Sequence, residues 1–141
     1  MKKVLVLGTH NSCISVMIAA LIKHISFNRI DVYSAGLRPK KINPYVQKVL
    51  MEIGIDISKE KSKSVNEFIH TKWDIIITTT EEARQRADTI LIGATKIHKT
   101  FDDPAKTKGG EIEKMNAFRE LRDEINEWLN EFIARHRLIP A

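Results

Sequence analysis

The 141-residue chain has one cysteine, Cys13, and few aromatic residues, which make up 6% of the sequence. A lone cysteine cannot form an internal disulfide, so the fold does not depend on an oxidising compartment. No cluster of aromatic residues suits stacking on bases, and the basic charge is spread along the chain, which disfavours nucleic acid as a partner.

Long apolar runs are also missing, and none approaches the length of a membrane span. The start of the chain, two lysines followed by the apolar residues 4–7, resembles a signal peptide. The apolar run stops at Gly8, however, and polar residues 9–12 follow, which an export signal does not tolerate. We therefore expect a cytoplasmic protein with no membrane partner. The net charge of +5 favours anionic partners in general.

What the chain does contain is a regular alternation of apolar patterns over the length of one ordinary domain, residues 1–141. In order, the patterns predict a strand at 4–7, a helix over 14–25, a strand at 30–34, a helix from the Asn43 cap and Pro44 to Gly54, a strand at 74–78, a short helix at 81–87, a strand at 96–99 and a helix over 111–135. This order predicts an α/β fold with a parallel sheet and helices on both faces.

The loop after the first predicted strand is the first place to look for a site, because ligands bind at the carboxyl ends of parallel strands. It leads into a helix N-terminus, where free backbone N–H groups and the helix dipole favour an anion. We therefore expect an anion-binding loop made of Gly8, Thr9, His10, Asn11, Ser12, Cys13, Ile14 and Ser15. An ordinary capped turn explains the same residue types equally well.

Together with this loop, six further segments resemble the low-molecular-weight protein tyrosine phosphatases, and more closely their relatives, the thioredoxin-coupled arsenate reductases. The segments are residues 33–37 (YSAGL), 42–44 (INP), 54–58 (GIDIS), 73–78 (WDIIIT), 101–106 (FDDPAK) and 118–125 (FRELRDEI). The resemblance extends over nearly the whole chain. It implies three layers with a four-stranded parallel sheet in the order 2-1-3-4, and neither a metal nor a cofactor.

The resemblance also shows what this chain has lost. The catalytic loop of the family is Cys-x5-Arg, in which the thiolate attacks phosphorus or arsenic and the arginine holds the equatorial oxygens. Gly8 stands at the cysteine position and Ile14 at the arginine position. Thr80 and Ala87 stand where the reductases carry their two relay cysteines. A relay of three cysteines is impossible in a chain that has one.

Two residues remain as candidates for catalysis. Cys13 is expected in the first turn of the helix, where a thiolate is stabilised, although a buried structural thiol is the favoured interpretation because free cysteine is so often buried. Asp103 matches the general acid of the family, but an Asp before Pro also stabilises an ordinary turn. Within the loop, a protonated His10 would supply positive charge.

Three hypotheses follow. In the first, the chain is a catalytically degenerate homologue that binds an oxyanion (phosphate, arsenate or sulfate) or a phosphorylated protein at the loop. In the second, it is a working arsenate reductase or tyrosine phosphatase with an altered mechanism that uses Cys13. In the third, it is a protein-interaction module with a vestigial cleft. The side chain of Ile14 either packs into the core or fills the cleft, and the sequence leaves both open.

Overall fold

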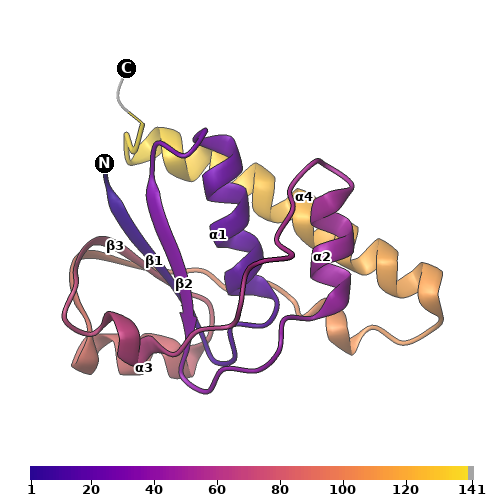
Figure 1. Cartoon of the computed structure of the whole chain (residues 1–141), viewed down its shortest axis with the longest axis horizontal. Coiled ribbons are helices and arrows are strands. Elements are labelled where there is room, and N and C mark those ends of the chain that lie inside the picture. The colour runs from indigo at the N-terminus through magenta and orange to yellow at the C-terminus, as the bar shows by residue number, and fades with distance from the viewer. Residues whose placement is uncertain (140–141) are drawn as a thin grey trace.

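The computed structural model describes residues 1–139, so the last two residues of the expected 1–141 domain lie outside the described residues. Four parallel strands, β1 (Lys3–Gly8), β2 (Asp31–Gly36), β3 (Lys72–Thr78) and β4 (Ile92–His98), form one sheet in the order β2-β1-β3-β4. The helices are α1 (Ile14–Ile25), α2 (Pro44–Met51), α3 (Glu81–Ile90) and α4 (Glu111–Arg135), with short 3-10 helices η1 (Val65–Phe68) and η2 (Pro104–Lys106). The predicted α/β class is confirmed (Figure 1).

The two faces of the sheet carry separate cores, as the alternation of side chains along a strand requires. Val4 and Val6 of β1 join the larger core, which is built with α1, α2 and α4. Leu5 and Leu7 join a smaller core with α3, where the buried helix residues are alanines. Figure 1 shows the consequence: α1, α2 and α4 are grouped together, and the short α3 lies apart from them near the lower end of the strands. These are the three layers that the resemblance implied.

Element boundaries differ from the predictions by more than two residues in three places. The helix expected to run to Gly54 ends at Met51, and Gly54 adopts a left-handed φ of 83° in the turn that follows. The helix expected at 81–87 continues to Ile90. The last strand begins at Ile92 rather than at residue 96. The cap of α2 is confirmed, because the Asn43 side chain accepts a hydrogen bond from the Tyr45 N–H.

The helices of the described chain are amphipathic or short. None of those within residues 1–139 combines the length and the apolar character needed to cross a membrane.

Candidate functional site

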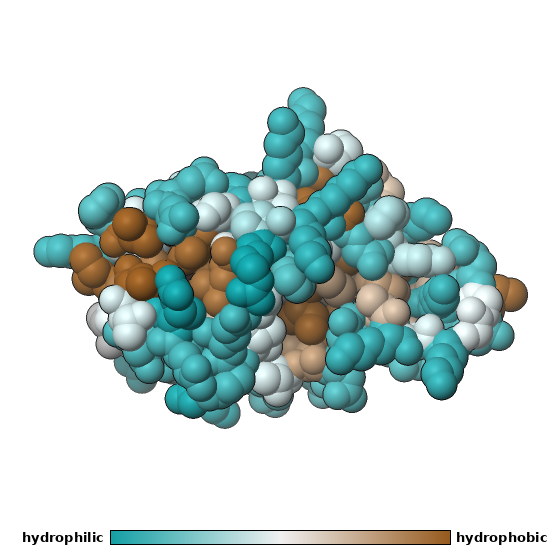
Figure 2. Space-filling model, turned by 90° about the horizontal axis from the view of Figure 1, so that it is seen from below, coloured by the Kyte–Doolittle hydropathy of each residue, from teal (hydrophilic) through white to brown (hydrophobic). Residues whose placement is uncertain are grey.

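The loop of residues 8–15 lies at the carboxyl end of β1, with the ends of β2 and β3 on either side. Gly8 pairs with Gly36 of β2, and a Cβ on Gly36 would lie 2.8 Å from the carbonyl carbon of His10. Only a glycine lets β2 approach the loop this closely. On the other side, the Thr9 and Thr80 hydroxyls are 2.9 Å apart. Figure 2 views the molecule from below, towards this end of the strands, and shows a mostly hydrophilic face with smaller apolar areas.

In the described part of the chain, most carbonyl groups of the loop accept backbone hydrogen bonds, whereas the N–H groups of residues 9–14 have no hydrogen-bond partner. The carbonyl oxygens of Gly8, Thr9, His10 and Ser12 accept hydrogen bonds from the N–H groups of Leu37, Arg38, Lys40 and Asn43, respectively. The Ser62 hydroxyl also donates to the His10 carbonyl, at 2.9 Å. Within residues 1–139, no N–H group of residues 9–14 donates a hydrogen bond to the protein. Consecutive free amides beside a helix N-terminus form a concavity that suits an anion.

Asn11 holds the bend of this loop. It is 2% exposed and has a left-handed φ of 49°, a conformation that asparagine tolerates better than most residues. Its Oδ1 accepts a hydrogen bond of 2.9 Å from the hydroxyl of Ser15, which is also buried. Its Nδ2 is buried and has no partner in the described part of the chain. The loop is therefore fixed from inside by a buried pair of side chains.

Cys13 does not occupy the place predicted for it. It is the N-cap residue of α1 rather than a residue of the first turn, and its side chain makes no capping hydrogen bond. Burial raises the pKa of the Cys13 thiol to about 12, and the negative charge of Asp103 acts in the same direction. Both causes disfavour the charged thiolate, which agrees with the favoured interpretation of Cys13 as a buried structural thiol. Cys13 packs against the larger core instead.

Ile14 and Gly8, the positions aligned with the family's arginine and cysteine, have closely packed surroundings. Ile14 is half-buried and packs against the larger core, so its side chain contributes to the interior. A Cβ on Gly8 would lie 3.0 Å from Oγ1 of Thr79 and 3.2 Å from Oγ of Ser15. A side chain at Gly8 would therefore require these two hydroxyl groups to shift by a few tenths of an ångström.

Asp103 is exposed, and its carboxylate caps η2 by accepting a hydrogen bond of 2.9 Å from the Ala105 N–H. The structure therefore contains the hydrogen bond by which an Asp before Pro stabilises a turn. Asp103 also lies close enough to Cys13 to influence its pKa, so η2 brings this carboxylate to the same end of the sheet as the loop.

Sequence reasoning missed the side chains that brace the loop from outside. The guanidinium of Arg38 pairs with the Glu82 carboxylate through two hydrogen bonds of 2.9 and 2.7 Å, and the Arg38 carbonyl lies 3.0 Å from Nδ1 of His10. Thr80 caps α3 by accepting from the Ala83 N–H. Their position along the chain could have indicated them, because residues that follow β2 and β3 must flank the end of β1 in this strand order.

Groups that could ligate a metal are not concentrated at this site. In the described residues, no three His, Cys, Asp or Glu side chains come together as a possible ligand set.

Comparison with known proteins finds relatives over nearly the whole chain. The sequence model of the low molecular weight phosphotyrosine protein phosphatases matches residues 3–138. An arsenate reductase of Halalkalibacterium halodurans is 36% identical over 131 residues, which cover 93% of this chain and 94% of that protein. An arsenate reductase of Bacillus subtilis is 36% identical over 126 residues, covering 89% and 91%, respectively.

Solved structures share the fold. An arsenate reductase in the phosphate binding state superimposes with a TM-score of 0.76 at 24% identity, covering 96% of this chain and 98% of that one. A low molecular weight protein tyrosine phosphatase from T. tengcongensis gives a TM-score of 0.77 at 18% identity, covering 96% and 99%.

Proposed function

The chain belongs to the low molecular weight phosphotyrosine protein phosphatase family, and from this premise we propose that it binds an oxyanion, or a phosphorylated partner, at residues 8–15 without performing the family's cysteine reaction. One observation carries the binding half of the proposal: the carbonyl groups of the loop are bonded to the segment after β2, while the amides of residues 9–14 have no partner in the described chain. Such amides can hold an anion without any charged side chain.

The catalytic half rests on three residues. Gly8 has no nucleophile to offer, and Ile14 has no guanidinium to hold the oxygens of a transition state. Cys13 is the single thiol of the chain, but with a pKa raised to about 12 it is neutral at physiological pH. Because the thiolate is the reactive form, the loop lacks an activated nucleophile.

Binding should be weaker than in a loop that carries arginine, because bidentate charge-assisted hydrogen bonds are lost. The guanidinium of Arg38, a residue that follows β2 beside the loop, is held in its pair with Glu82. His10 is the remaining loop residue that can become positive, and protonation would add attraction for the anion.

The relatives point to the chemistry of the anion. They are arsenate reductases, so phosphate and arsenate, which are close in size and charge, are the first ligands to test. A working enzyme that uses Cys13 is the second candidate, favoured only by the position of this thiol beside the loop and near Asp103.

The test is a titration of isotopically labelled protein with phosphate, arsenate and sulfate, followed through the backbone amides of residues 8–15. Saturable shifts confined to these amides are expected. No shift at millimolar anion would contradict the proposal and would leave an interaction module with a vestigial cleft as the better account.

Turnover decides between a binding protein and an altered enzyme. We expect no release of phosphate from p-nitrophenyl phosphate and no reduction of arsenate with an external thiol. Turnover that disappears in Cys13→Ala would establish catalysis by that cysteine, whereas anion binding that survives in Cys13→Ala supports a passive loop.

A further inference from the structure

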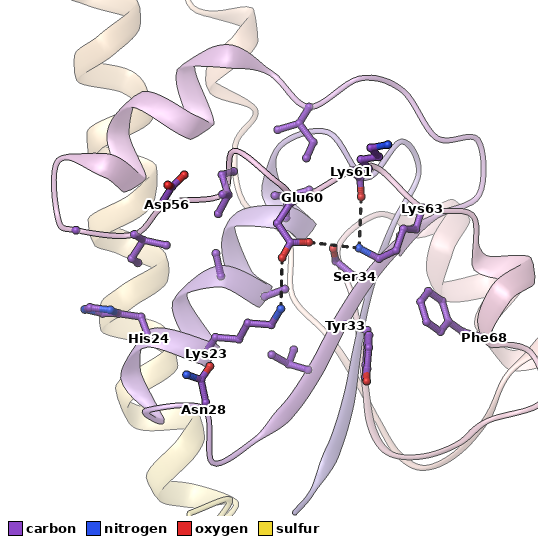
Figure 3. A pocket seen from close by; sticks show the side chains of 18 of the residues that line it. Lys23, His24, Asn28, Tyr33, Ser34, Asp56, Glu60, Lys61, Lys63 and Phe68 are labelled. Carbon is purple, nitrogen blue, oxygen red and sulfur yellow. Dashed lines mark hydrogen bonds and ion pairs between the residues drawn. The ribbon is translucent and has the colours of Figure 1, made fainter.

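The β2 edge of the sheet is covered by the chain itself. A cavity of about 850 Å³ lies along α1, between β2 and the segment of residues 54–63 (Figure 3). Three lysines and three carboxylates line it, namely Lys23, Lys61, Lys63, Asp56, Glu60 and Glu67, so its charges are balanced. Val32 and Ser34 of β2 are only 2% and 6% exposed, and the Gly36 N–H donates to the Lys63 carbonyl. A further strand therefore has no access to this edge.

The opposite edge, formed by β4, is open. Ile92 is 52% exposed, and Thr95, Lys96 and His98 are exposed as well. Within residues 1–139, β4 pairs with β3 and no strand or bridge pairs with its other side. The two edges of the sheet therefore differ, and the edge at β4 is the one that a partner can reach.

The direction of the main-chain groups of β4 follows from one hydrogen bond. The Lys99 N–H donates to the Thr78 carbonyl of β3, at 2.9 Å. Because the main-chain groups of successive residues in a strand point to opposite sides, Ile97 and Thr95 also face β3. The N–H and carbonyl groups of residues 92, 94, 96 and 98 face away from the sheet. Such a row of donors and acceptors is a template for pairing with another strand.

The devices that protect an edge strand in natural proteins are weak in β4. The strand contains no proline, and none of its described residues has a positive φ. Its register with β3 keeps a constant offset from the first pair to the last, so no bulge interrupts it. Nζ of Lys96 is held by Oδ1 of Asp88 in α3, at 3.2 Å, which reduces the charge that would repel a second strand.

The sequence of β4 fits a second copy of itself in antiparallel register. With Thr95 on a two-fold axis, Lys96 lies opposite Ala94, and no like charges face each other. Ile92 then lies opposite His98, and all outward-facing residues of both strands form hydrogen-bonded pairs. Shifting this register one way places Lys96 opposite Lys96, and shifting it the other way leaves His98 without a strand partner. A two-fold axis is also what a closed homodimer requires.

We propose that this chain self-associates through the outer edge of β4, by antiparallel pairing about a two-fold axis at Thr95, so that one sheet continues through both copies. The contact is a single pair of strands, which is at the small end of protein interfaces, so the dimer is weak and exchanges with the monomer. This surface is separate from the oxyanion loop, and the pairing does not depend on anion binding.

Sedimentation equilibrium of the full chain measures the association. We expect the weight-average mass to rise from one chain towards two between about 10 µM and about 1 mM. In 15N-labelled protein, hydrogen exchange at the amides of Ile92, Lys96 and His98 should slow as the concentration rises. The amides of Thr95 and Ile97 face β3 and should be protected at every concentration. The mass of one chain at about 1 mM, or a dimer in which the outward amides stay unprotected, would overturn the proposal.

Opposite substitutions test the position of the axis. In Thr95→Lys or Thr95→Glu, like charges of two copies face each other, so each variant should self-associate at least about three-fold more weakly than the unaltered chain. An equimolar mixture of the two variants brings a lysine opposite a glutamate, and it should associate about ten-fold more strongly than either variant alone.

The matched control carries the same charges at the other edge. Ser58→Lys and Ser58→Glu alter an exposed residue of the segment beyond β2, and they should leave association within about two-fold, alone or mixed. A mixture of the Thr95 variants that associates no more strongly than its components would overturn the two-fold pairing, and so would an equal gain in the mixture of the Ser58 variants.

Discussion

At the scale of single residues, the position of Cys13 determines how reactive its thiol is. Cys13 stands before the first turn of α1 and packs against the core, so lost hydration, followed by the charge of Asp103, disfavours its thiolate. A pKa raised from 9.0 to about 12 lowers the thiolate fraction near pH 8 by about a thousand-fold.

We therefore expect iodoacetamide to modify native Cys13 about 10³-fold more slowly than the unfolded chain at pH 8. The rate should rise about tenfold per pH unit up to pH 11, since only the thiolate reacts. Mass spectrometry of alkylated protein, with and without urea, measures both rates. A native rate equal to that of the unfolded chain would show an accessible, ordinary thiol and would revive Cys13 as a nucleophile.

The buried pair inside the loop predicts an unequal response of two serines. Ser15→Ala removes the donor to Oδ1 of Asn11, leaving a buried acceptor unsatisfied, which costs about 1–3 kcal/mol of unfolding free energy. Ser12→Ala is the matched control, because that half-buried hydroxyl makes no hydrogen bond in the described residues, and it should cost less than about 0.5 kcal/mol. Urea denaturation without anion measures the unfolding free energy of both variants. Equal losses would show that the Asn11–Ser15 hydrogen bond does not stabilise the loop.

At the scale of secondary-structure elements, Glu52 after α2 ties that helix to α4. Its carboxylate accepts hydrogen bonds from Arg119 at 3.0 and 2.7 Å and from Arg122 at 2.9 Å. The hydrogen bonds from Arg119, followed by those from Arg122, lower the pKa of Glu52 from 4.5 to about 2. Because the folded pKa is the lower one, this stabilisation is present above pH 4.5 and is lost as the pH falls towards 2.

Glu52→Gln should therefore lower the free energy of unfolding at pH 7, and the difference from the unaltered chain should shrink between pH 4.5 and 2. Glu127→Gln, at an exposed residue of α4 that makes no ion pair in the described chain, should leave stability unchanged across this range. Urea midpoints at pH 7, 4.5, 3.5 and 2.5 give the comparison. A difference that is constant with pH would mean that packing, not charge, is what Glu52 contributes.

How well each element could be predicted depends on how much of its own stabilisation is local. The bounds of α4, Glu111–Arg135, were predicted because its apolar stripe is long and continuous. The start of β4 was predicted four residues too late, because Gly93 and Thr95 carry no apolar alternation and this segment is a strand through its pairing with β3. The burial of Cys13 was favoured from its residue type alone, but the distant elements that pack against it could not be predicted from the local sequence.

At the scale of the whole molecule, the sequence pointed to the end of the sheet where the loop lies but not to what surrounds it. The pair between Arg38 and Glu82 joins residues 44 positions apart, and no local pattern announces it. The cavity along α1 needs three distant segments to close around it. Both features follow only from the strand order, which makes β2 an edge and places its end beside the loop.

If the chain lacks catalysis, as proposed, because of the residues at positions 8 and 14, restoring the family's cysteine and arginine there should produce activity on the same fold. We expect no release of p-nitrophenol from p-nitrophenyl phosphate by the unaltered chain, by Gly8→Cys or by Ile14→Arg, and measurable turnover by the double variant. A cysteine fits at Gly8 once the Thr79 hydroxyl, 3.0 Å from the new Cβ, yields by a few tenths of an ångström. Adding Asp103→Asn should then lower turnover about 10²-fold if this carboxylate acts as general acid. A double variant that binds phosphate but does not turn over would show that the surrounding structure, and not the two missing side chains alone, has diverged from catalysis.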